Sequence, residues 1–162
     1  MNDKMSLYLS GLIDVENLDL TYNWRNEAIE YFKHYDVKIY NPLRNKMLDK
    51  KPIFDFNEIV DRDIYDLQKS DIILVNFIVD EKIKKIAFGT PMEIALAYWL
   101  RKPIIFVSND ENVRRHYWVQ RMSTKIFKEI NQAMAYIVQN YIILEGENLC
   151  INVENKSCQE KQ

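Results

Sequence analysis

The sequence predicts an α/β protein: a single doubly wound domain in which helices cover both faces of a five-stranded, mainly parallel sheet. Two observations predict this class. Short apolar runs alternate along the chain with segments of helical periodicity, an order typical of strand–helix–strand units. Several of these runs are apolar at nearly every position, as expected for strands that are buried on both faces, and such strands occur mainly in parallel sheets.

Four of the five expected strands can be placed on apolar runs. Residues 6–13 (SLYLSGLI) form the first, and residues 37–40 (VKIY) form a short second strand that an Asn-Pro pair closes as a turn. Residues 71–79 (DIILVNFIV) and 103–107 (PIIFV) are nearly unbroken in apolar character. We therefore expect the last two to be buried in the middle of the sheet.

Helical periodicity predicts four helices between and after these strands. Residues 22–34 carry apolar side chains along one side, and residues 56–69 carry an apolar stripe. Residues 90–100 are apolar on all sides, so this helix is expected to be buried on most of its surface. The last helix lies within residues 124–140, with residues 130–140 as its main part.

Length and composition indicate one domain. The chain has 162 residues, which suits a single hydrophobic core, and only 3 Gly and 4 Pro, which argues against linkers. We assign residues 1–145 to the domain and residues 146–162 to a polar tail.

Charge and cysteine usage exclude several classes of function. The formal net charge of -2 does not show the excess of positive charge that is typical of proteins that bind nucleic acid or an anionic membrane. The N-terminus shows no signal peptide and no run reaches membrane-spanning length, so we expect a cytoplasmic protein. Cys150 and Cys158 lie in the polar tail, and His34 and His116 are far apart, so no metal site is expected.

Glu93 is the first residue that suggests chemistry, and two interpretations compete. In the segment FGTPMEIALAYW, Thr90, Pro91 and Glu93 fit a capping box in which the carboxylate only starts the helix. However, the helix follows the loop after the strand at 71–79, so it opens at the carboxyl edge of the sheet, where ligands bind. An ionised carboxylate at that edge could act as a nucleophile.

Asp63 is a second carboxylate in an unexpected place. On a helical wheel it falls within the apolar stripe of residues 56–69, whereas Asp61 and Asp66 fall outside it and are expected to be solvated. Burying a charge without a partner is costly. Asp63 is therefore either part of a buried salt bridge or cap, or a second acid in the same crevice as Glu93.

Weaker signals come from the first two strands and from the segment after the last predicted strand. Gly11 could allow a close backbone approach to a ligand, and Tyr8 places a hydroxyl within an apolar strand, although most strand tyrosines belong to the core. Asn41 reads as a turn residue that could line the crevice. Residues 116–122 (HYWVQRM) could cover the crevice, contact a neighbouring subunit or form a partly buried amphipathic segment.

Three segments resemble the nucleoside 2-deoxyribosyltransferase family, which also includes deoxynucleoside 5′-monophosphate N-glycosidases. They are YLSG, the helix and strand VDRDIYDLQKSDIILVNF, and FGTPMEIALAYWLRKPIIFV, which looks like the family's Gly-Thr-x-x-Glu motif with its helix and strand. The last two, in this order, are fairly specific. The resemblance runs from about Ser6 to Ile137 and implies a flavodoxin-like fold and a homo-oligomer whose sites a neighbouring subunit completes.

The resemblance also implies roles for individual residues. Glu93 matches the catalytic nucleophile, Asp63 matches the acid that assists proton transfer, and Tyr8 matches the hydroxyl beside the nucleophile. No metal or organic cofactor is implied. The residues assigned to substrate binding are Ser10, Gly11, Asn41, Gly89, Thr90 and Met92.

The implied reaction is cleavage of the N-glycosidic bond of a 2′-deoxynucleoside through a deoxyribosyl–Glu93 ester, followed by transfer of the sugar to another nucleobase. One departure leaves alternatives open. Transferases of the family carry an Asp where this chain has Ala87, and the related N-glycosidases carry a Ser there. Lys82, Lys84 and Lys85 could bind a 5′-phosphate instead. The alternatives are thus a deoxynucleoside 5′-monophosphate N-glycosidase or a nucleotide-binding module without turnover.

Overall fold

The computed structural model describes residues 4–44, 55–79 and 87–142 and contains a five-stranded sheet in the order β2-β1-β3-β4-β5. All four pairings between neighbouring strands are parallel. The strands are β1 (Met5–Gly11), β2 (Val37–Tyr40), β3 (Ile72–Asn76), β4 (Ile104–Val107) and β5 (Lys125–Phe127). The helices are α1 (Leu18–Phe32), α2 (Phe56–Lys69), α3 (Gly89–Trp99), α4 (Glu111–Arg115), α5 (Tyr117–Met122) and α6 (Ile130–Tyr141).

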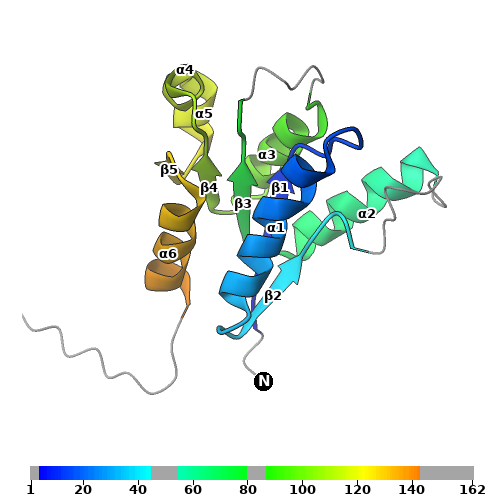
Figure 1. Ribbon diagram of the computed structural model, residues 1–162, viewed down its shortest axis with the longest axis horizontal. Helices are drawn as coiled ribbons and strands as arrows, with labels where there is room; N and C mark the ends of the chain where they lie inside the picture. Colours follow the sequence, from blue (N-terminus) through cyan, green and yellow to red (C-terminus); the bar gives the residue numbers. More distant parts are fainter. Residues whose placement is uncertain (1–3, 45–54, 80–86, 143–162) are drawn as a thin grey trace, which may run out of the picture.

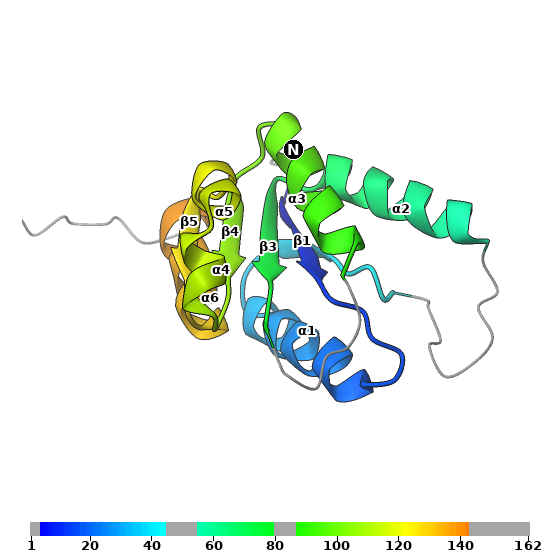
Figure 2. The same ribbon diagram turned by 90° about the horizontal axis from the view of Figure 1, so that it is seen from above.

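The sheet is a middle layer between helices, as the apolar strands predict. Figure 2 shows α1 on one side of β1 and β3, and α2 and α3 on the other side. One hydrophobic cluster joins the sheet to α1 and α6, and a second joins it to α2, α3 and the region of α4 and α5 (Figure 1). Every residue of β3 and of β4 is buried, which confirms that these two strands are covered on both faces of the sheet.

The order of the strands fixes where a ligand can bind. From β1 the chain crosses to β2 on one side, and from β3 it continues to β4 and β5 on the other side. This is the flavodoxin-like strand order, and its switch point lies between β1 and β3. A ligand crevice is therefore expected outside the carboxyl ends of these two strands, where α3 also begins.

The fifth strand lies where the sequence predicts the beginning of a helix. Residues 125–127 pair with β4 in the register Ile105↔Lys125, and α6 begins only at Ile130. The strand is three residues long and none of them is fully buried, so it lacks the apolar character that marks the other strands. The two short helices α4 and α5 were likewise not predicted separately.

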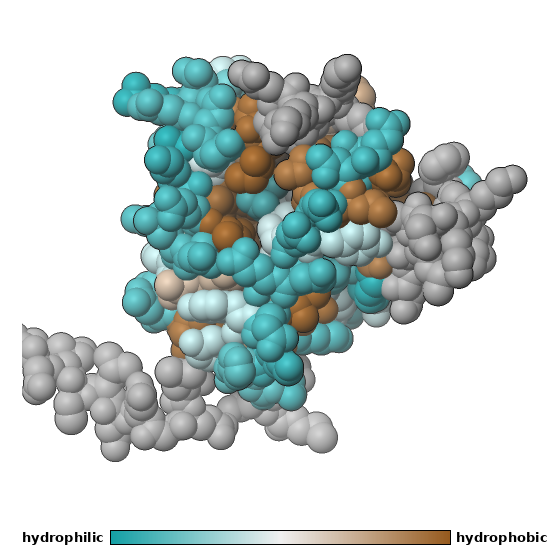
Figure 3. Space-filling view, in the orientation of Figure 1, coloured by the Kyte–Doolittle hydropathy of each residue, from teal (hydrophilic) through white to brown (hydrophobic). Residues whose placement is uncertain are grey.

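The prediction that the third helix is buried on most of its surface is wrong for the single chain. Only Thr90, Ile94 and Ala97 of α3 are buried, whereas Met92 is 68% exposed and Trp99 is 83% exposed. The apolar sequence of α3 thus leaves a hydrophobic surface uncovered. By contrast, the side of the molecule that carries α1 is mainly hydrophilic, with hydrophobic residues in separate patches (Figure 3).

Several predictions fall on residues that the structure does not describe. They are the polar tail at residues 146–162, both cysteines, and the lysine-rich segment with Lys82, Lys84 and Lys85. Within the described part of the chain, no helix is long and apolar enough to cross a membrane.

Candidate active site

Glu93 is held by two hydroxyl groups of β1. The Tyr8 phenol donates a hydrogen bond to Oε1 of Glu93 at 2.7 Å, and the Ser10 hydroxyl donates one to Oε2 at 2.5 Å. The helix α3 begins at Gly89, with Phe88 at the N-cap position and no side-chain cap. The capping-box interpretation is therefore wrong, and the carboxylate points to the sheet instead.

The alternation of side chains along β1 explains how this pair of donors arises. Residues two apart in a strand face the same side, so Tyr8 and Ser10 both face α2 and α3, while Leu7 and Leu9 face the cluster around α1 and α6. Tyr8 and Ser10 are both fully buried. Because a buried hydroxyl needs a partner, the carboxylate of Glu93 also satisfies these two groups.

Burial is the main influence on the ionisation of Glu93. It raises the pKa of the carboxyl group, and the nearby charge of Asp63 raises it further, whereas the hydrogen bonds from Ser10 and Tyr8 and the charge of Arg25 lower it. The net pKa lies above the usual value for glutamate. Burial, together with the charges of Glu93 and Asp63, raises the pKa of Tyr8, so its phenol remains a hydrogen-bond donor at physiological pH.

Asp63 lies on the side of α2 that faces the site. Its side chain is 17% exposed, and Oδ1 lies 3.8 Å from Nη2 of Arg62 in an ion pair. The charge of Asp63 acts on Glu93 and Tyr8, so the structure brings the two predicted acids into one electrostatic environment. The ion pair agrees with the salt-bridge interpretation, and the role of Asp63 as a second acid stays a prediction.

The prediction that Asp66 is solvated is wrong. Its side chain is fully buried and forms a bidentate pair with Arg44, in which Nη2 lies 2.8 Å from Oδ1 and Nη1 contacts Oδ2. Val60 and Ile64, by contrast, are 56% and 38% exposed. The buried face of α2 therefore does not coincide with the apolar stripe. It includes Asp66, whose partner Arg44 follows β2 in the chain.

Gly11 allows a close approach, but between parts of the protein. A Cβ atom at this position would lie 2.8 Å from Cζ2 of Trp24 and 2.9 Å from the backbone oxygen of Asn76. At Gly89 a Cβ atom would meet nothing within 4 Å among the residues that the structure describes. The absence of a side chain is therefore required for packing at Gly11 and not at Gly89.

The other predicted substrate-binding residues occupy different environments. Asn41 forms the expected turn, since its Oδ1 accepts a hydrogen bond from the amide of Leu43 at 3.0 Å. Thr90 is buried in the first turn of α3, while Met92 points to solvent. In the described part of the chain, no three His, Cys, Asp or Glu side chains are grouped so that they could hold a metal ion.

A comparison with protein families shows the family of the chain. A family model described as "Nucleoside 2-deoxyribosyltransferase like" matches residues 4–111, a span that includes Tyr8, Asp63 and Glu93. The chain belongs to the nucleoside 2-deoxyribosyltransferase-like family. A search of curated proteins found no match.

Solved structures similar to this nucleoside 2-deoxyribosyltransferase-like protein share its Rossmann-like fold at low sequence identity. A 2-deoxyribosyltransferase from Bacillus psychrosaccharolyticus is 17% identical, with a TM-score of 0.60 over 81% of this chain and 91% of that chain. A 2-desoxiribosyltransferase from Leishmania mexicana is 18% identical, with a TM-score of 0.63 over 85% and 99% of the two chains. A CMP N-glycosidase from Clostridium botulinum is 12% identical, with a TM-score of 0.53 over 83% and 98%.

The nucleoside 2-deoxyribosyltransferase-like chain also contains a buried arginine that the sequence analysis missed. Arg25 of α1 is fully buried, and its guanidinium donates hydrogen bonds to the backbone oxygens of Gly11 (2.8 Å), Leu12 (3.2 Å) and Thr21 (2.6 Å). Burial lowers its pKa to about 10. A signal was present in the sequence, because Arg25 shares a helical face with the buried Ala28.

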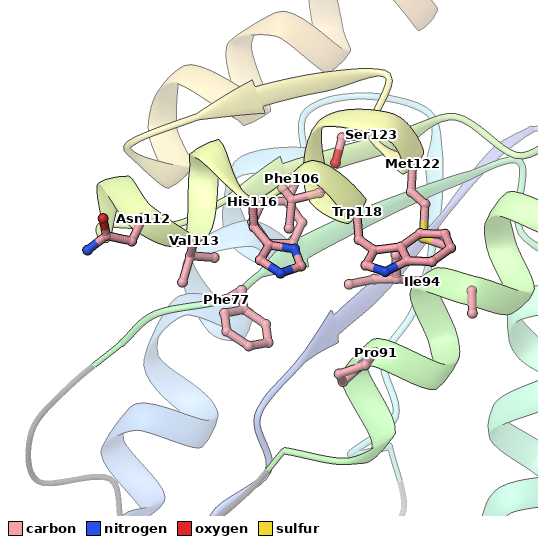
Figure 4. Close-up of a pocket in the computed structure, with 12 residues that line it drawn as sticks. Phe77, Pro91, Ile94, Phe106, Asn112, Val113, His116, Trp118, Met122 and Ser123 are labelled. Atoms are coloured by element: carbon pink, nitrogen blue, oxygen red, sulfur yellow. The ribbon is translucent and has the colours of Figure 1, made fainter.

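Beside the site, α3 borders an apolar pocket of about 550 Å³. His116 and Trp118, which belong to residues 116–122, form one wall of this pocket (Figure 4). The opposite wall includes Phe77 and, from α3, Pro91 and Ile94. The same helix thus presents Glu93 to β1 and apolar side chains to this pocket. In the single chain only Val119 and Met122 of residues 116–122 are partly buried, and contact with a neighbouring subunit or covering of the crevice stays a prediction.

Proposed function

We propose that the protein is an enzyme that cleaves the N-glycosidic bond of 2′-deoxynucleosides and transfers the deoxyribosyl group from Glu93 to another nucleobase. The observation that carries this proposal is the double hydrogen bonding of the Glu93 carboxylate by Tyr8 and Ser10 at the carboxyl edge of the sheet. Membership of the family supports the reaction class.

In the first half of the reaction, one carboxylate oxygen of Glu93 attacks C1′ of the deoxynucleoside. The C1′–N bond breaks through an oxocarbenium-like state, its electron pair leaves with the base, and the base takes up a proton delivered from the region of Asp63. The product is a deoxyribosyl ester of Glu93. In the second half, a nitrogen of another base attacks C1′, its proton passes to the region of Asp63, the ester bond breaks, and Glu93 returns as a carboxylate.

Tyr8 and Asp63 support these steps in different ways. The phenol of Tyr8 orients the carboxylate and stabilises its negative charge when Glu93 leaves C1′. The charge of Asp63 acts on Glu93, and two neighbouring acids in different environments can divide the roles of nucleophile and proton donor.

A base-exchange assay tests the proposal. Purified protein is incubated with each deoxynucleoside and each deoxynucleoside 5′-monophosphate, with and without a second free base, and the products are separated by chromatography. We expect a new nucleoside only when the second base is present, and no product from the Glu93→Gln variant. The Asp61→Asn variant, which changes an exposed acid of α2, serves as the control and is expected to retain activity.

A second candidate function is hydrolysis of a deoxynucleoside 5′-monophosphate. Lys82, Lys84 and Lys85 favour it, because they could bind a 5′-phosphate, whereas Ala87 counts against it, because the resemblance leads us to expect a Ser at this position in such an N-glycosidase. Release of free base without an acceptor would assign the protein to this class. Well-folded protein that converts none of these substrates would contradict both enzyme functions and leave a nucleotide-binding module.

We also propose that a second copy of the chain covers the exposed apolar side of α3 and α5. Phe88, Met92, Trp99, Tyr117 and Trp118 are each more than half exposed, which is unusual for a monomer. Light scattering after size exclusion is expected to give at least a dimer. The Trp99→Lys variant should dissociate it, whereas Val15→Lys, which changes an exposed apolar residue outside α3 and α5, should not. A monomeric wild-type protein would contradict this proposal.

A further inference from the structure

We propose that Ser10 is a positioning residue that fixes the second carboxylate oxygen of Glu93 and keeps the nucleophile ionised. The sequence analysis assigned Ser10 to substrate binding. In the structure its side chain is fully buried and its hydroxyl donates to Oε2 of Glu93 at 2.5 Å. This inference rests on the proposed function of Glu93, and it assigns the hydroxyl of Ser10 to the enzyme's own carboxylate.

The two donors on Glu93 have separate tasks because they bind different oxygens. Tyr8 holds Oε1 and Ser10 holds Oε2, so together they fix the rotation of the carboxylate plane. A single donor would leave that rotation free. Each carboxylate oxygen has two lone pairs, so one lone pair on each oxygen remains for attack on C1′.

The charged groups around Glu93 explain why a second donor is needed. Burial and the charge of Asp63 on α2 both disfavour the carboxylate form. Arg25 on α1 favours it, but the hydrogen bonds of its guanidinium go to backbone oxygens, so it acts only through space. Tyr8 and Ser10 are thus the groups that stabilise the carboxylate by direct contact, and removing one of them should raise the pKa of Glu93.

The hydrogen bond from Ser10 also affects the covalent intermediate. An ester oxygen is neutral and accepts a hydrogen bond more weakly than a carboxylate oxygen does. Ser10 therefore stabilises the state in which Glu93 is free more than the state in which it carries the sugar. Without the hydroxyl, the ester should form more slowly at low pH and, once formed, should break down more slowly.

The matched control for Ser10 lies on the same strand. Ser6 faces the same side of β1, is 5% exposed, and donates its hydroxyl to Oδ2 of Asp71 at 2.7 Å. The Ser6→Ala variant thus removes a similar bond between a hydroxyl and a carboxylate at the opposite end of the strand. Any general effect of losing a buried serine from β1 should appear in both variants.

The test is a direct titration of Glu93 by NMR, using protein labelled with ¹³C at the glutamate carboxyl carbons. The signal of Glu93 is assigned by its absence in the Glu93→Gln variant. In Ser10→Ala we expect its pKa to rise by about one to two pH units, and in Ser6→Ala we expect no change. A Ser10→Ala protein whose Glu93 titrates as in the wild type would overturn the proposal.

Two further measurements keep the inference separate from the proposed function. Ser10→Cys preserves the size of the side chain with a weaker donor, so it should shift the pKa of Glu93 in the same direction by a smaller amount even if Ser10→Ala folds poorly.

Intact-protein mass spectrometry during turnover should show at least a severalfold greater fraction of deoxyribosyl-enzyme in Ser10→Ala than in the wild type. If the pKa shifts as expected but no variant ever carries the sugar, the role of Ser10 stands and the proposed function fails.

Discussion

The phenol of Tyr8 donates a 2.7 Å hydrogen bond to Oε1 of Glu93, although 85 residues separate the two in the chain. The contact exists because β1 is an inner strand, between β2 and β3, and α3 packs against it. A buried carboxylate is thereby built into the packing of the domain. Such an arrangement is expected to reduce stability in exchange for reactivity.

Glu93→Gln should therefore inactivate the protein and stabilise it at neutral pH. The folded-state pKa of Glu93 is raised, so the folded state binds its proton more tightly than the unfolded state does. The contribution of Glu93 to the free energy of unfolding is therefore fully present below about pH 4.5, the pKa of glutamate in the unfolded chain. It is lost as the pH rises through the higher pKa of Glu93 in the folded state. A neutral glutamine avoids that loss.

Thermal unfolding of the wild type and of Glu93→Gln at pH 4 and pH 8 checks this prediction. The melting temperatures should be similar at pH 4, and the variant should be higher at pH 8, by about 2–4 °C for each kcal/mol gained. A variant that melts below the wild type at pH 8 would mean that the carboxylate is a net stabilising group.

Asp63→Asn should lower activity and move the acid limb of the pH–rate profile to lower pH. The charge of Asp63 raises the pKa of Glu93, so its removal makes the nucleophile easier to ionise. Loss of a general acid lowers the rate by about 10²- to 10⁴-fold. The shift is opposite in sign to the one expected for Ser10→Ala, and Asp61→Asn should cause neither effect. An acid limb that stays in place would show that Asp63 does not act on Glu93.

Arg44→Met should destabilise the fold more than Asp66→Asn does. Asp66 is fully buried, whereas the side chain of Arg44 is 37% exposed. Removing the arginine leaves a buried charge without its partner, which costs about 3–5 kcal/mol. Removing the charge of Asp66 instead lets Arg44 turn toward water, so the cost is about 1–2 kcal/mol. Urea unfolding measures the free energy of unfolding of both variants. Equal losses in the two would contradict the view that the cost comes from the buried charge of Asp66.

The apolar runs predicted the fold because central strands of a parallel sheet have no polar side. The bounds of β2 and α2 agree with the predicted ranges of 37–40 and 56–69. The three-residue strand β5 could not be predicted, since its partly exposed side chains resemble those of a loop. Its place in the sheet depends on pairing with β4, which is a contact distant in sequence.

For the site, the sequence indicated which residues matter better than it indicated what each one does. Glu93 and Asp63 stand out because they interrupt apolar patterns, and in the structure the charge of Asp63 acts on Glu93. Periodicity assigns the inward face of a helix by its apolar residues, so it misplaced Asp66, whose partner is the charged group of Arg44. The bond from Ser10 to Glu93 depends on how α3 docks, which no local pattern encodes.

The two glycines of the site should respond differently to substitution by alanine. In Gly11→Ala the new Cβ atom would lie within 3 Å of Trp24 and of the backbone of Asn76, so we expect a loss of about 1–3 kcal/mol and a disturbed Ser10. In Gly89→Ala the Cβ atom meets open space in the first turn of a helix, so stability should be unchanged or slightly higher. Chemical unfolding and steady-state kinetics of both variants check this.

The kinetics of Gly89→Ala also test its predicted role in substrate binding. If the substrate approaches the backbone there, the variant should fold normally, retain its kcat and show a raised KM, because the added methyl group obstructs binding but not the chemistry. Normal KM with normal stability would remove Gly89 from the substrate-binding residues. Since the added Cβ contacts no other part of the described chain within 4 Å, a raised KM in this variant would point to contact with the substrate itself.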